Sequence, residues 1–99
     1  MNQMQQMLFQ AQKMQRELQK AHAELEGKEF AVEKNGMVKA VVMGNRTIKT
    51  LDIDKDALDP DNKEMLEEAI VLALNDAYAQ IDKANADIEE KVTGQKGLF

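Results

Sequence analysis

The sequence contains no cysteine, so neither a disulfide-framed fold nor a thiolate metal site is possible. Its 99 residues are enough for one domain, residues 1–99, but a chain of this size buries only a moderate fraction of its surface. Because cross-links cannot add stability, burying more apolar surface against a second copy of the chain is the remaining route. The composition therefore favours a homodimer.

Long apolar runs are also missing. The longest, Ala69–Leu74, is far shorter than the roughly 20 residues that a helix needs to cross a bilayer. The first twelve residues lack the basic segment and the continuous apolar segment of a secretory signal. We therefore expect a cytoplasmic protein.

Signs of catalytic or metal chemistry are scarce. The one histidine, His22, lies beside an apolar helical seam with no cysteine or second histidine, which disfavours a metal or general-base role. The aspartates from Asp52 to Asp61 do not form an EF-hand loop, since the sixth position is Ala57 and the twelfth is Lys63. A solvated acidic turn that caps a helix is the simpler interpretation. With no Walker loop and no dinucleotide fingerprint, we expect no enzyme, no catalytic residues, no metal and no cofactor.

The net charge of −5 is unevenly distributed along the chain. Residues 1–50 carry eight Lys and Arg against five Asp and Glu, whereas residues 51–99 carry five against thirteen. An acidic chain is not an obvious nucleic-acid binder. Any DNA-binding surface must therefore come from this local asymmetry.

Residues 2–26 have the pattern of one long helix, with Asn2 as N-cap and Gly27 just after its end. Apolar residues recur with alternating gaps of three and four and form a heptad seam. The seam consists of Met4, Met7, Ala11, Met14, Leu18, Ala21 and Leu25. Such a helix is about 37 Å long, more than the roughly 26 Å diameter expected for this chain. Residues 1–27 are therefore expected to form an arm that projects or lies against a second subunit.

Residues 28–54 predict a three-stranded antiparallel sheet. Asn35-Gly36 is a strong signal for a type I′ hairpin turn. The second strand is apolar on both faces, so we expect it at the centre of the sheet and covered on both sides. Ile48 is out of phase with the later apolar residues, which indicates a bulge near Lys49-Thr50. The expected strands are Lys28–Lys34, Met37–Met43 and Arg46–Ile53.

Residues 60–92 have a helical pattern that follows the N-cap signal Asp59-Pro60. The heptad phase slips between Ala77 and Ile81. A slip of this kind indicates either a change of packing partner or a break into two helices, and the sequence leaves both open. Residues 93–99 are expected to be a flexible tail.

Three basic residues, Lys13, Arg16 and Lys20, lie on the helix face opposite the seam. Arg16 and Lys20 form a like-charge pair four residues apart, which mildly destabilises an isolated helix. That small cost makes sense if the face binds an anion, although an ordinary solvated face remains the alternative. The sheet residues Lys39, Arg46 and Lys49 could also bind an anion, but their spacing does not place them on one defined surface.

Three segments carry a family resemblance: Leu51-Asp52-Ile53-Asp54, the stretch Asp59–Glu68, and Asn75-Asp76-Ala77. With the order of helix, hairpin and strands, they resemble the YbaB/EbfC family of bacterial nucleoid-associated proteins. The similarity covers nearly the whole chain, and Lys63–Ala77 is its most specific part. The family often has a glycine-rich stretch where this chain has Glu33–Gly36, which should tighten the hairpin.

The resemblance implies an α/β (α+β) fold, with a long N-terminal helix, a three-stranded antiparallel sheet and one or two C-terminal helices. It also implies a tweezers-like homodimer that binds double-stranded DNA with little sequence specificity. Nucleoid association and roles in nucleoid organisation and gene regulation are further expectations.

Together, the residues and the resemblance predict a non-enzymatic homodimer that binds DNA phosphates. The alternative is a protein–protein adaptor, in which the methionine-rich heptad helix docks a partner helix. The candidate DNA-binding residues are Lys13, Arg16 and Lys20, followed by Lys83 and Lys91. The candidate dimer residues are Met7, Met14, Leu18, Val41, Leu66, Ile70 and Leu74.

Overall fold

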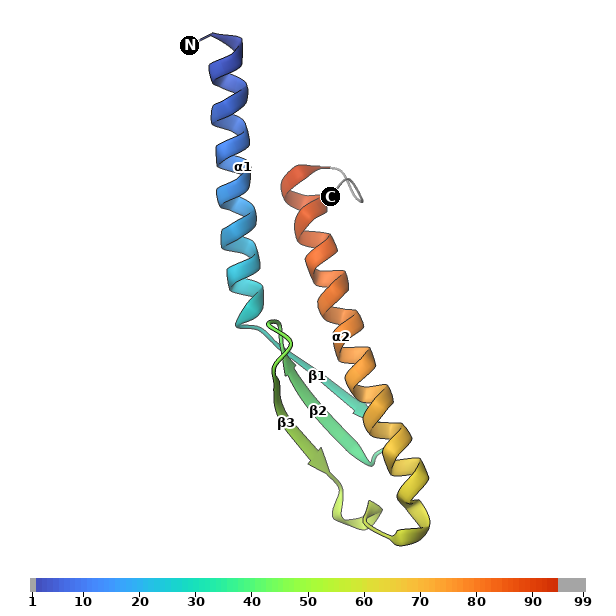
Figure 1. The fold of residues 1–99 in the computed structure, drawn as a ribbon. Coiled ribbons are helices and arrows are strands. Elements are labelled where there is room, and N and C mark those ends of the chain that lie inside the picture. Colours follow the sequence, from blue (N-terminus) through green and yellow to red (C-terminus); the bar gives the residue numbers. More distant parts are fainter. Residues whose placement is uncertain (1, 95–99) are drawn as a thin grey trace.

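The computed structural model describes residues 2–94 and has the predicted α+β architecture (Figure 1). A long helix leads into three antiparallel strands, and a second long helix follows two short 3-10 turns. Residues 95–99 of the expected tail lie outside the described part of the chain. The elements are α1 (Gln3–Glu26), β1 (Glu29–Lys34), β2 (Val38–Met43), β3 (Ile48–Ile53), η1 (Lys55–Ala57), η2 (Pro60–Asn62) and α2 (Lys63–Thr93).

The molecule is long and thin, with principal extents of 71 × 21 × 13 Å. Its radius of gyration is 19.4 Å, well above the roughly 13 Å of a compact chain of this length. Helix α1 extends upward from the sheet, whereas α2 runs along the sheet and continues upward beside α1, which projects beyond the end of α2 (Figure 1). The expected helical arm is thus present in the single chain.

Helix α1 begins with a reciprocal capping box. The side-chain oxygen of Asn2 accepts a hydrogen bond from the Gln5 amide at 2.8 Å, and the Gln5 side chain accepts one from the Asn2 amide at 3.2 Å. These bonds satisfy amide groups that the first turn leaves unpaired, which confirms the predicted N-cap. Gly27 ends the helix, but with a φ of −89° it lacks the left-handed conformation typical of a glycine just after a helix.

The sheet has the order β1-β2-β3. Asn35 and Gly36 both have positive φ, at 56° and 64°, and confirm the predicted type I′ turn between β1 and β2. The register of β3 shifts by one residue, because Val41 pairs with Thr50 whereas Val42 pairs with Ile48. Lys49 is therefore the extra residue of the predicted bulge.

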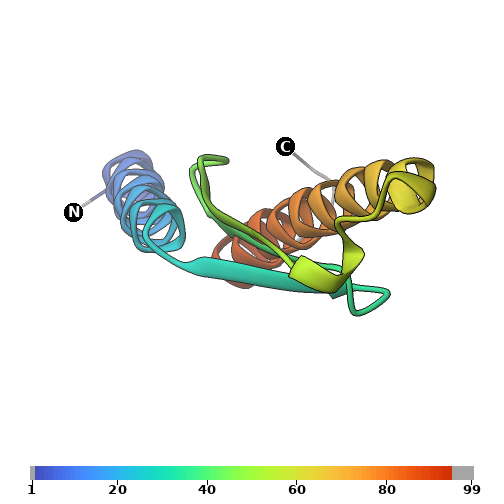
Figure 2. The ribbon, with the colours of Figure 1, turned by 90° about the horizontal axis from the view of Figure 1, so that it is seen from below.

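Strand β2 is central, as predicted, but within one chain only one of its faces is covered. Helix α2 lies along that face, and the opposite face of the sheet is bare (Figure 2). Val38, Ala40 and Val42 are buried beneath α2, whereas Lys39 on the opposite face is exposed and Val41 is half-buried. The expectation of cover on both faces was wrong because the chain supplies only one long helix that packs on the sheet.

The core is a thin layer between the sheet and α2. An alanine stripe on α2, spaced by four residues, lets the helix lie close to the strands. Within the described chain, the buried cluster consists of Val32, Val38, Ala40, Val42, Ala69, Ala73, Ala77 and Ile81.

Helix α2 is a single continuous helix through Ala77 and Ile81, so the heptad slip does not mark a break. Its earlier turns pack on β1 and β2, and its later turns lie beside α1 (Figure 1). The slip therefore marks a change of packing partner, one of the two alternatives that the sequence left open.

Candidate nucleic-acid interface

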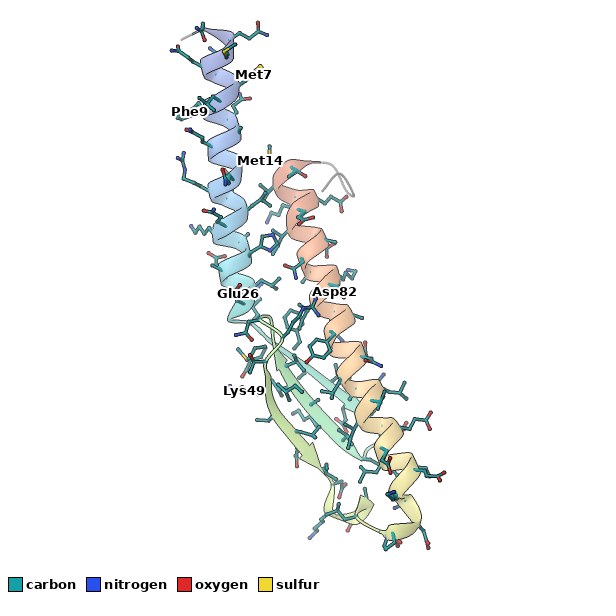
Figure 3. The ribbon with its side chains drawn as sticks, in the orientation of Figure 1. Met7, Phe9, Met14, Glu26, Lys49 and Asp82 are labelled. Atoms are coloured by element: carbon teal, nitrogen blue, oxygen red, sulfur yellow. The ribbon has the colours of Figure 1, made fainter. Side chains whose placement is uncertain are left out.

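The apolar seam of α1 becomes less buried toward the tip of the arm. Leu25 at its base is 3% exposed, and Leu18 and Met14 are half-buried against α2. Met7 and Met4 are 65% and 79% exposed, because α2 ends before it reaches them (Figure 3). The upper turns of α1 thus have every face open to solvent in the single chain.

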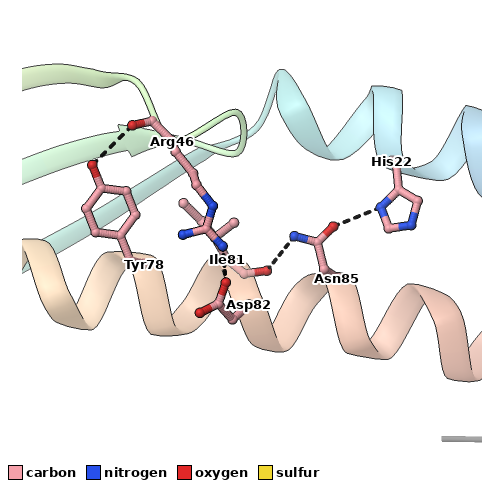
Figure 4. Close-up of polar contacts among 6 residues, drawn as sticks. All are labelled: His22, Arg46, Tyr78, Ile81, Asp82 and Asn85. Carbon is pink, nitrogen blue, oxygen red and sulfur yellow. Dashed lines mark hydrogen bonds and ion pairs between the residues drawn. The ribbon is translucent and has the colours of Figure 1, made fainter. Parts of the chain in front are cut away.

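The base of the arm is fixed to α2 by a polar contact. His22 Nδ1 lies 2.8 Å from Asn85 Oδ1, and Asn85 Nδ2 donates to the Ile81 carbonyl at 3.2 Å (Figure 4). Since the Asn85 nitrogen faces a carbonyl, its oxygen is the acceptor and His22 Nδ1 is the donor. The contact of His22 with Asn85 therefore joins α1 to α2 and has a structural role. Among residues 2–94, His, Asp and Glu side chains form no group of three suited to a metal ion.

Arg46, in the turn between β2 and β3, is tied to α2. Its guanidinium carbon lies 5.6 Å from the centroid of the Tyr78 ring, and it pairs with Asp82 (Figure 4). Tyr78 Oη donates back to the Arg46 carbonyl at 3.1 Å. These contacts stabilise Arg46 at a positive φ of 75°. The positive charge of Arg46 is therefore already paired with a carboxylate of the same chain.

The other sheet cations lie among acidic neighbours. Lys49, at the bulge, pairs with Glu29 on β1. Lys39 is exposed on the bare face of the sheet, in register with Glu33 on one side and Asp52 on the other. The sheet therefore presents no uncompensated basic patch.

The basic row on α1, formed by Lys13, Arg16 and Lys20, differs from the sheet cations because it has no acidic partners in the part of the chain that the structure describes. All three side chains are exposed, on the side of α1 away from the seam that faces α2. Within residues 2–94, none of the three forms an ion pair or a hydrogen bond. Of the second-choice residues, Lys83 lies 3.5 Å from Asp87, and Lys91 is exposed in the last turn of α2. The α1 row is thus the clearest open basic surface on the described chain.

One cluster of acidic residues lies at the other end of the molecule. Eight Asp and Glu and only two Lys lie between residues 52 and 68, from the end of β3 through η1 and η2 to the start of α2. The side chains of Asp54 and Asp59 cap η1 and η2, accepting amide hydrogen bonds at 3.0 and 2.9 Å. This confirms the predicted acidic capping turn. The local charge asymmetry that DNA binding would require is therefore present in the fold.

A second uncovered surface is apolar and lies on β3. Through the bulge, Ile48 and Leu51 face the same side as the core, opposite Val42 and Ala40. Helix α2 packs over β1 and β2 but not over β3, which leaves Ile48 45% and Leu51 43% exposed. Neither residue is among the dimer residues predicted from the sequence, although the predicted bulge places both on one face of the sheet.

The predicted dimer residues lie on three separate parts of the chain. Met7, Met14 and Leu18 follow the α1 seam, and Val41 is on the bare face of the sheet. Leu66, Ile70 and Leu74 are half-buried on α2, where they pack against the core cluster.

No helix of the described chain is long and apolar enough to cross a membrane.

Comparison with known proteins agrees with this geometry. The model of the YbaB/EbfC DNA-binding family matches residues 1–96. A nucleoid-associated protein of Enterococcus faecalis is 44% identical over 99% of this chain and 96% of its own length. A nucleoid-associated protein of Mycoplasmopsis pulmonis is 40% identical over 94% of this chain and 92% of its own. The chain belongs to the YbaB/EbfC DNA-binding family.

Proposed function

We propose that this protein binds double-stranded DNA through phosphate contacts, with little sequence specificity, as part of the bacterial nucleoid. The main support for this proposal is the basic row of Lys13, Arg16 and Lys20. These three cations are exposed, form no ion pair among the described residues, and lie on an arm that projects from the body. Phosphate contact requires positive charge at suitable spacing and carries little sequence information. Lys83 and Lys91 are the second contributors in this proposal.

The active form in this proposal is a homodimer. Its supporting observations are the apolar surface that one chain leaves open at Ile48 and Leu51, and the incomplete burial of Leu66, Ile70 and Leu74 on α2. Two copies related by a twofold axis would bury these residues against each other. Met7, Met14 and Leu18 on the arm extend the proposed interface, whereas Val41 lies on the opposite face of the sheet and remains a separate candidate for contact between copies. Two arms, each with one basic row, would then form the tweezers.

The test is a salt titration of DNA binding with the variant Lys13→Gln/Arg16→Gln/Lys20→Gln. Each neutralised phosphate contributes about 0.9 to the slope of log affinity against log salt, so six contacts per dimer give a slope near −5. The variant removes charge but keeps good helix formers. It should remain folded, bind weakly on every DNA sequence and show a much flatter slope.

The matched control is Lys39→Gln/Lys55→Gln/Lys63→Gln. It removes the same positive charge from the sheet and the acidic end, away from the arm. Its salt slope should equal that of the parent protein. A triple arm variant that binds as the parent does would exclude this face as the DNA contact.

A protein–protein adaptor is the second candidate, and the exposed apolar residues Met4, Met7 and Leu8 at the tip of α1 favour it. Methionine-rich apolar surfaces adapt to different partner helices. The same titration separates the two functions, because an adaptor would show no DNA binding by the parent protein even at low salt.

A further inference from the structure

The basic row on α1 contains an aromatic residue that the heptad seam does not explain. Phe9 precedes Lys13, Arg16 and Lys20 with gaps of four, three and four residues, so all four lie on one face of the helix. Figure 3 shows Phe9 pointing away from the side that carries Met7 and Met14. Within α1 as the structure describes it (Gln3–Glu26), Phe9 is the only large apolar side chain on this face, and it is 53% exposed.

The angular positions give the row a definite shape. At about 100° per residue, Arg16 lies about 20° to one side of Phe9, and Lys20 and Lys13 lie about 20° and about 40° to the other side. A helix in the major groove has its central line toward the base edges and its flanks toward the phosphate walls. Phe9 therefore occupies the position from which a side chain reaches the floor of the groove.

We propose that Phe9 contacts the 5-methyl group of thymine in the major groove, while the flanking cations bind phosphates. This inference rests on the proposed DNA-binding function and deepens it. A phenyl ring has no hydrogen-bonding group, so it gains only from apolar atoms, and the thymine methyl is the apolar group that base edges present in this groove. Phe9 thereby adds a modest preference for A·T pairs to binding that phosphate contacts dominate.

The test uses two duplexes of identical A·T-rich sequence, one of them with uracil in place of thymine. Uracil keeps the base pairing and lacks only the methyl group. Losing one buried methyl contact corresponds to about a fourfold change in affinity. The parent dimer, with two arms, should therefore bind the thymine duplex about fifteenfold more tightly. The variant Phe9→Ala should bind both duplexes equally and keep the salt slope of the parent.

The control variant is Leu8→Ala. Leu8 is adjacent and similarly exposed, at 60%, but lies about 100° around the helix from Phe9. It should keep the thymine preference of the parent. Both variants place alanine in an exposed helix, where it has the highest helix propensity, so both should fold.

Three results would overturn the inference: no thymine preference in the parent, an unchanged preference in Phe9→Ala, or an altered oligomeric mass of Phe9→Ala in light scattering. The last would assign Phe9 to an interface between copies of the chain. Failure of the DNA-binding function itself is distinguishable, because the parent would then bind neither duplex at low salt.

Discussion

Gly44 lies directly against the backbone of Leu25, so that a Cβ atom at position 44 would be 1.8 Å from the Leu25 carbonyl oxygen. The Gly44 amide also donates to the Lys28 carbonyl at 2.9 Å. The end of α1 and the turn after β2 therefore meet backbone to backbone. Only glycine fits at this point, and the direction of the arm relative to the sheet depends on it.

We expect Gly44→Ala to destabilise the protein by about 1–3 kcal/mol or more, because backbone atoms must move to admit the methyl group. The free energy of unfolding from urea titration measures the effect. Gly27→Ala is the control, since its Cβ would have only an ordinary contact at 3.8 Å. A stability of Gly44→Ala equal to that of the control would disprove the close contact.

The hairpin turn at Gly36 gives a second prediction. Its φ is +64°, and an added Cβ would meet nothing within 4 Å, so a substitution there has a conformational cost and no steric one. Gly36→Val should lower the stability by about 1–3 kcal/mol, whereas Gly36→Asn should cost less because asparagine tolerates positive φ. Thermal unfolding of the two variants measures the difference. An unchanged melting temperature for Gly36→Val would mean that Gly36 does not adopt the positive φ of this turn.

The proposed dimer predicts that Leu51→Glu dissociates the protein into monomers. Leu51 is already 43% exposed in one chain, so a charge there should disrupt the interface more than the fold. Light scattering at micromolar concentration should give twice the chain mass for the parent and the single mass for the variant. Leu58→Glu, at an exposed leucine after η1 that lies outside the proposed interface, should remain dimeric. A monomeric parent would refute the proposed assembly.

Ile81 marks the point where α2 passes from the sheet to α1, and it is fully buried. Ile81→Ala should cost about 2–5 kcal/mol, through lost burial and the cavity left behind. Chemical denaturation followed by circular dichroism gives the value. Leu8→Ala, which truncates an exposed leucine on the arm, should change the stability by less than about 0.5 kcal/mol. Similar losses in the two variants would contradict the assigned core.

Local patterns in the sequence predicted the elements well. Heptad spacing located α1, Asn35-Gly36 located the first turn, and the phase change after Ile48 located the bulge. Each of these signals is contained within a few neighbouring residues, where backbone conformation and side-chain spacing are directly linked.

Contacts between distant residues could not be predicted in the same way. The pairing of Arg46 with Asp82 joins residues 36 positions apart, and it removes a cation that the sequence left as a DNA candidate. The close approach at Gly44 likewise depends on where α1 ends in space. The placement of Phe9 on the basic face, by contrast, follows from helical spacing alone, because it precedes Lys13 by four residues.

The capping box at Asn2 also determines how the arm resists opening. The side chains of residues 2–13 are all exposed in the single chain, so mainly the cap, the backbone hydrogen bonds of the helix and helix propensity hold these turns. Isolated helical turns of this kind open with a free energy near zero, whereas the packed base at Leu25 opens only with the whole fold. Amide hydrogen exchange along α1 should therefore slow steadily from tip to base, and the basic row spans the middle of that gradient.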